Sequence, residues 1–221
     1  LALFFLGQPD RAFLATAHAV WYSKDSGATW SPLSTPFLPH KLLLAFTGAA
    51  HPSGHESLLY SWVATTPSLS DNNAPPSSEL WISRDGGDSW NRSDPHGLLP
   101  PPHSRGVHRL LVSPASPSRL YAFRPFTTAT DTVLRSDNAG NTWHSIAGFD
   151  QRLAPSLGES YLSAYFPSII DWDITAAAIN PTDANHLLFS HYASVFQTRN
   201  GGATWENLET ILAPGQSCPI T

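Results

Sequence analysis

One eight-residue pattern occurs four times in this chain of 221 residues. Each copy has aspartate or asparagine third, glycine fifth and tryptophan last. The copies are SKDSGATW (23–30), SRDGGDSW (83–90), SDNAGNTW (136–143) and TRNGGATW (198–205). Because four related stretches recur along one chain, the sequence predicts an array of similar structural units.

The segments around each pattern follow a common order. In the third copy HRLLVSP, SRLYAF and DTVLR precede or enter the pattern, and HSIAG follows it. Such short runs of Leu, Val, Phe, Tyr and Thr, bounded by Pro, Gly, Asn or Asp, are typical of β-strands. The first run of each unit is almost continuously apolar, which favours a strand buried on both faces.

A four-stranded unit that recurs with this period is typical of a propeller blade. The sequence therefore predicts an all-β chain, a β-propeller of about four four-stranded antiparallel blades that forms part of a larger propeller. We expect one domain over residues 1–221. The expected blades cover about 1–36, 40–94, 106–148 and 172–210.

Each eight-residue pattern, called a box below, reads as a turn between the third and fourth strands. The third residue can accept backbone N–H bonds in the turn, and the glycine can take a positive φ. The tryptophan then starts the outer strand, and we expect it to be buried between neighbouring sheets. These positions are Asp25, Asp85, Asn138 and Asn200; Gly27, Gly87, Gly140 and Gly202; and Trp30, Trp90, Trp143 and Trp205.

Composition excludes several classes of function. The net charge is −5 and the chain has two lysines, Lys24 and Lys41, which argues against binding to nucleic acid or anionic membranes. One cysteine, Cys218, excludes an internal disulfide and a cysteine-based zinc cluster. The apolar opening LALFFLGQP is too short for a membrane span or a signal peptide. We expect no metal, no cofactor and no membrane insertion within this segment.

The box resembles the Asp-box (BNR) repeat of sialidase-like propellers. Families with such boxes include sialidases, sortilin-type receptors, xyloglucan-degrading hydrolases and photosystem assembly factors. The resemblance implies that ligands bind on the face opposite the boxes, on loops that join strands two and three or successive blades. Three long loops qualify: 67–78, 91–107 and 149–172. We also expect an extracellular or cell-surface location.

The loop 149–172 combines carboxylates with aromatic rings, which suits sugar binding because rings stack on pyranose faces and acids accept hydroxyl hydrogen bonds. Alternatively, its aromatic residues simply cover the top of the core. The expected ligand-binding residues are Trp172, Tyr161, Tyr165, Arg152 and Arg105. The candidate catalytic acids are Asp173, Asp171 and Glu159.

Two of these families are catalytic, the sialidases and the xyloglucan hydrolases. The Phe-Arg-Ile-Pro motif of sialidases is absent from the chain. The stretch DWDITAAAINPTDANHLLF (171–189) is similar to a strand of xyloglucan hydrolases, which use two opposed carboxylates, but Thr175-Ala176-Ala177 stands where a carboxylate is expected.

The leading hypothesis is therefore a non-catalytic propeller that binds a glycan or a protein through its long-loop face. The alternative is a fragment of a propeller glycoside hydrolase with paired carboxylates. A receptor or assembly scaffold differs from the first mainly in its partner. We further expect an open arc, whose first and last blades carry apolar faces that further blades or a partner would cover.

Overall fold

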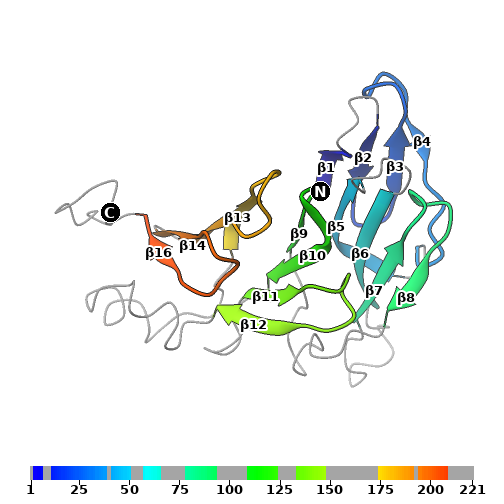
Figure 1. Cartoon of the computed structure of the whole chain (residues 1–221). Helices are drawn as coiled ribbons and strands as arrows, with labels where there is room; N and C mark the ends of the chain where they lie inside the picture. The colour runs from blue at the N-terminus through cyan, green and yellow to red at the C-terminus, as the bar shows by residue number, and fades with distance from the viewer. Residues whose placement is uncertain are drawn as a thin grey trace, which may run out of the picture.

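The fold consists of four four-stranded antiparallel sheets, each of which pairs its strands in chain order. The computed structural model describes residues 2–6, 11–38, 41–50, 57–65, 78–93, 109–123, 133–147, 174–191 and 194–208. Within these ranges there are sixteen strands and no helix. The sheets follow one another in a curved row, with the first and the last at opposite ends (Figure 1). This arrangement confirms the predicted all-β blade architecture.

The four sheets are numbered as blades in chain order. Blade 1 comprises β1 (Ala2–Phe5), β2 (Ala12–Ala15), β3 (Val20–Ser23) and β4 (Ser31–Pro32). Blade 2 comprises β5 (Lys41–Ala50), β6 (Ser57–Thr65), β7 (Ser78–Ser83) and β8 (Asn91–Ser93). Blade 3 comprises β9 (Arg109–Ser113), β10 (Ser116–Phe123), β11 (Val133–Ser136) and β12 (His144–Ala147). Blade 4 comprises β13 (Ile174–Ile179), β14 (Leu187–His191), β15 (Ser194–Thr198) and β16 (Glu206–Asn207).

All four boxes form the turn between the third and fourth strands of a blade, as predicted. In the first box the backbone N–H of Gly27 donates to Ser23 Oγ at 2.8 Å, and the N–H of Thr29 donates to Asp25 Oδ1 at 2.8 Å. The Thr29 hydroxyl donates to the other carboxylate oxygen at 2.6 Å. Gly27 has φ +90°, a conformation that side chains with a Cβ adopt poorly. The turn is thus closed by its own side chains.

In the third and fourth boxes the side-chain amide of an asparagine makes the hydrogen bonds that the aspartate carboxylate makes in the first box. Asn138 Oδ1 accepts the N–H of Thr142 at 2.9 Å, while its Nδ2 donates to the Thr142 hydroxyl at 2.9 Å. Asn200 makes the same two bonds to Thr204, at 2.9 and 2.7 Å. Because an amide offers both a donor and an acceptor, asparagine preserves the turn without a charge.

Three apolar clusters hold the blades together, one between each pair of neighbours. The cluster between blades 1 and 2 centres on aromatic rings, with Phe37 edge-on to Trp90 at 5.3 Å. Between blades 2 and 3 the cluster contains Trp62, Leu80 and Trp143. Between blades 3 and 4 Phe123 of blade 3 packs edge-on against Phe189 of blade 4 at 5.9 Å. The core therefore lies between the sheets.

Hydrogen bonds reinforce two of these interfaces. The hydroxyl of Tyr60 donates to the carbonyl of Pro117 in blade 3 at 2.8 Å, and that of Tyr121 donates to the carbonyl of Ala184 in blade 4 at 2.7 Å. Burial raises the pKa of both tyrosines, although nearby arginines oppose the rise. Both phenols therefore remain protonated donors, which a buried carbonyl needs.

The prediction that all four box tryptophans are buried is wrong for Trp30. Trp143 and Trp205 are buried and Trp90 is half-buried, but Trp30 is 37% exposed. Each buried ring packs in the interface with the preceding blade, and no described residue precedes blade 1 on that side. For the same reason β1, expected to be buried on both faces, exposes Leu3 and Phe5.

The box glycine should tolerate a side chain less well than its neighbour. A Cβ at Gly202 would lie 2.6 Å from Ile146 Cδ1 of blade 3, and φ there is +94°. Ala203 is exposed. We expect Gly202→Val to lower the free energy of unfolding by about 2 kcal/mol or more relative to Ala203→Val. Equal midpoints for the two variants in urea unfolding would contradict this.

The charged boxes should make the fold sensitive to acid. The pKa of Asp85 is lowered from 3.8 to about 2, chiefly because the Ser89 hydroxyl donates to the carboxylate. Desolvation raises the pKa, but hydrogen bonds from the Ser89 N–H and the Ser83 hydroxyl lower it further. A lowered folded pKa gives stability that is present above about pH 4 and lost as the pH falls towards 2. We expect Asp85→Asn, which copies the third box, to lose less melting temperature over that interval than the wild type. Asn138→Asp should lose more, and the same acid dependence in all three proteins would refute the assignment.

Candidate functional site

The candidate site residues predicted from the sequence all lie outside the described ranges, so they remain predictions. These are Trp172, Tyr161, Tyr165, Arg152, Arg105, Asp173, Asp171 and Glu159. The same holds for most of the loops 67–78, 91–107 and 149–172. What the structure does describe is the edge of the blades from which these loops leave.

The strand directions define this edge. The boxes join third and fourth strands at one end of every blade, so first strands begin and fourth strands end at the opposite end, called the loop end below. Three charged residues lie at the loop end because they stand at or next to the start of a first or third strand. Lys41 is the first residue of β5, Glu79 is the second residue of β7 and Arg109 is the first residue of β9. Arg92 of β8 lies beside them through its contact with Glu79.

Glu79 is the centre of an ionic cluster at the loop end. Its carboxylate contacts Lys41 Nζ, accepts the indole N–H of Trp81 at 2.9 Å and lies 3.4 Å from Arg92 Nη1. Burial opposes ionisation, but the hydrogen bonds from Lys41 and Trp81 and the charges of Lys41 and Arg92 outweigh it and lower the pKa of Glu79. A carboxylate held ionised in this way is unsuited to act as a proton donor.

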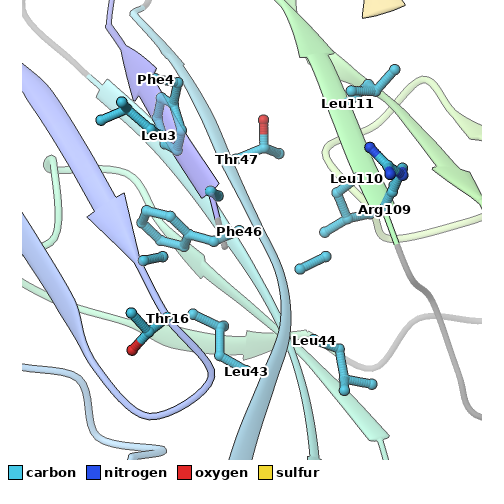
Figure 2. Close-up of a pocket in the computed structure, with 13 residues that line it drawn as sticks. Leu3, Phe4, Thr16, Leu43, Leu44, Phe46, Thr47, Arg109, Leu110 and Leu111 are labelled. Atoms are coloured by element: carbon cyan, nitrogen blue, oxygen red, sulfur yellow. The ribbon is translucent and has the colours of Figure 1, made fainter. Parts of the chain in front are cut away.

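A hollow of about 610 Å³ lies along the inner strands of blades 1 to 3. Its walls come from β1, from residues 43–47 of β5 and from the start of β9, with Thr16 at one side (Figure 2). Phe46 and Leu43 lie on the same side of β5 as Phe4, and Arg109 and Leu111 lie on its other side. The volume falls in the range of ligand sites, although polar atoms make up more of the hollow's surface than apolar atoms.

Three carboxylates at the box end hold the structure of the turns or pair with arginines. Asp25 and Asp85 accept hydrogen bonds from their own turns. Asp137 accepts from Arg119 at 2.6 Å and from Arg135 at 2.8 Å. Among the described residues, no three of His, Cys, Asp and Glu gather closely enough to hold a metal ion. No helix in the described part of the chain is long and apolar enough to cross a membrane.

Sequence reasoning missed both described features of the loop end. Lys41 and Glu79 are 38 residues apart, and only the pairing of β5 and β7 with β6 brings them together. A weak signal existed, because both are charged residues at the start of otherwise apolar runs. The hollow has no local signal, since three different blades line it.

Comparison with known proteins supports the architecture. No family model matches the sequence, and the search of curated proteins gave no match. Among solved structures, the GH74 xyloglucanase from Xanthomonas campestris has a TM-score of 0.57 at 21% identity over 93% of this chain and 30% of its own. An ancestral GH74 enzyme has a TM-score of 0.55 at 16% identity, over 94% of this chain and 25% of its own. YCF48 from Cyanidioschyzon merolae has a TM-score of 0.53 at 20% identity, over 93% of this chain and 54% of its own.

The chain has the β-propeller fold. These similarities lie below the identity at which activity can be transferred, so they carry the fold alone. The chain spans between a quarter and about half of the length of the proteins it resembles.

Proposed function

We propose that this chain is a non-catalytic binding propeller that takes a glycan or protein ligand at its loop end. The observation that carries the proposal is the position of β5. Its first residue, Lys41, belongs to the ionic cluster on Glu79, and its residues 43–47 line the 610 Å³ hollow. One strand thus joins fixed charge to a recess, and charged groups beside a recess can orient a ligand.

The charge of the described loop end supports binding more than acid catalysis. Three cationic side chains, Lys41, Arg92 and Arg109, stand there with one carboxylate, and Lys41 and Arg92 contact it. A glycosidase needs two opposed carboxylates, one of them protonated at neutral pH. Glu79 does not fit the protonated role because its pKa is lowered.

The alternative is a part of a propeller glycoside hydrolase. The similarity of residues 171–189 to a strand of xyloglucan hydrolases favours it, and Asp173 directly precedes β13 in the sequence. Under this hypothesis Asp173, Asp171 or Glu159 would be one of the two acids. The second acid would come from another part of a propeller pair.

A glycan array probed with the full chain, together with a screen for sugar release from xyloglucan oligosaccharides, tests the proposal. We expect binding without sugar release, and at least about tenfold weaker binding for Trp172→Ala or Tyr161→Ala, since buried aromatic anchors dominate such sites. Lys24→Ala, an exposed change in the first box, is the matched control and should bind normally.

Three results would contradict the proposal. Release of reducing sugar that is abolished by Asp173→Asn would establish the hydrolase. Loss of binding in Lys24→Ala, with normal binding in the Trp172 and Tyr161 variants, would place the ligand at the box end. If the array shows no glycan, titration with candidate peptides tests the protein branch with the same variants, and the absence of both kinds of ligand would refute it.

A further inference from the structure

The three residues of β8 form a sequence pattern that has a chemical meaning apart from the fold. Residues 91–93 read Asn-Arg-Ser, which matches the acceptor sequence for N-linked glycans, Asn-X-Ser/Thr with X other than proline. No other asparagine in the sequence has this pattern, since Asn180 is followed by Pro181. Such a tripeptide is frequent by chance, so the surroundings of its two essential residues, Asn91 and Ser93, decide its meaning.

Asn91 lies at a position that faces solvent in every blade. The residue in question directly follows the box tryptophan, and it is exposed in all four copies: Ser31, Asn91, His144 and Glu206. β8 is also an edge strand of blade 2, on the side away from β5 (Figure 1). The hollow is lined from β5 and from the first strands of blades 1 and 3. A glycan on Asn91 therefore has room on the folded chain and leaves the hollow open.

Ser93 stands where the other blades carry an aliphatic side chain. It is the third residue after the box tryptophan, and the same place is held by Leu33, Ile146 and Leu208. Ser93 is 9% exposed, and its hydroxyl oxygen is buried without a hydrogen-bond partner among the described residues. A polar group thus occupies a buried place that the repeat otherwise fills with an apolar group.

This hydroxyl costs the fold stability rather than supplying it. A hydroxyl that is buried without a hydrogen bond loses the bonds that it makes to water in the unfolded chain. The buried serine of the second box differs, since Ser83 Oγ accepts the N–H of Gly87 at 2.7 Å. Ser61 and Ser78 also have unpartnered hydroxyls, but neither follows an asparagine by two residues. At Ser93 alone does such a hydroxyl coincide with an exposed acceptor asparagine.

We propose that Asn91 is a site of N-linked glycosylation and that the Ser93 hydroxyl serves the transfer of the glycan rather than the fold. In the transfer, Nδ2 of Asn91 forms a bond to the anomeric carbon of an oligosaccharide, whose bond to a lipid pyrophosphate breaks. The lipid pyrophosphate leaves with the electron pair of that bond, and the amide loses one proton. Because the transferase and its lipid-linked donor belong to the secretory pathway, the chain must pass through that pathway.

The burial of Ser93 sets the time of the transfer. In the folded chain β8 is paired with β7, with Leu80 opposite Ser93, and the hydroxyl is enclosed. A transferase that recognises the asparagine and the hydroxyl together cannot reach both there. Before β8 pairs with β7 the same three residues are accessible. We therefore expect the glycan to be added to the nascent chain and not to the folded one.

Mass spectrometry of the full chain, isolated from the organism that makes it, tests the proposal. We expect a mass that exceeds that of the sequence by a single glycan. Peptide N-glycosidase, which converts a glycosylated asparagine to aspartate, should remove the glycan and leave an aspartate at position 91. A native chain in which Asn91 is unmodified would overturn the proposal.

Variants of the full chain, translated with a cleavable signal sequence in the presence of microsomes, test the role of the hydroxyl. The wild type and Ser93→Thr should both gain the glycan, whereas Asn91→Gln and Ser93→Ala should gain none. Folded wild-type chain added to detergent-opened microsomes should stay unmodified. Urea unfolding of the unmodified proteins reports on the fold, and Ser93→Ala should have a midpoint at least as high as the wild type, because it removes an unpaired hydroxyl.

Three results in these assays would count against the proposal. A glycan that persists in Asn91→Gln would place the modification elsewhere. A clearly lower urea midpoint for Ser93→Ala would show that the hydroxyl serves the fold. A glycan on chain that was added after folding would contradict the assigned timing.

Discussion

The fold depends on one repeated contact, in which an aliphatic side chain of one blade lies over the box glycine of the next. Leu33, Leu80 and Ile146 make this contact from three successive blades. At Gly87, Gly140 and Gly202 the approach is so close that a Cβ would lie within 2.8 Å of the covering side chain. Glycine therefore serves two purposes there: it permits the positive φ of the turn and leaves room for the neighbouring sheet.

Turn chemistry and blade stacking are separable parts of this design. Side chains within each box close the turn, whether the third residue is an aspartate or an asparagine. The first box shows the separation most clearly, since Asp25 and Ser23 make their bonds although Trp30 lies exposed. A box is thus a complete local structure that becomes an interface only when another blade meets it.

The same separation explains what the sequence could predict. Turn positions, strand order and blade number follow from local residue types, and the structure agrees with them. Burial of a box tryptophan depends on a neighbouring blade. The prediction of burial is therefore right for Trp143 and Trp205 and wrong for Trp30, although all three stand in the same motif. Ser93 holds the place in blade 2 that Leu33 holds in blade 1 and Ile146 in blade 3, and its strand partner Leu80 covers Gly140 instead. This exchange and the pairing of Lys41 with Glu79 depend on cross-strand register that no single segment encodes. The predicted ligand residues of loop 149–172 remain predictions, because the repeated pattern of strands and turns does not determine the conformation of a long connecting loop.

A double-mutant cycle between Leu80 and Gly140 tests the central contact most directly. A Cβ at Gly140 would lie 2.5 Å from Leu80 Cδ2, an atom that Leu80→Ala removes. Gly140→Ala and Leu80→Ala, alone and together, should show a coupling free energy of about 1 kcal/mol or more in urea unfolding, with the double variant less destabilised than the sum of the single effects. Gly140→Ala with Ile146→Ala, whose side chain belongs to the cluster between blades 3 and 4, should be additive. Additive effects for Leu80 and Gly140 as well would contradict the dependence of the fold on this contact.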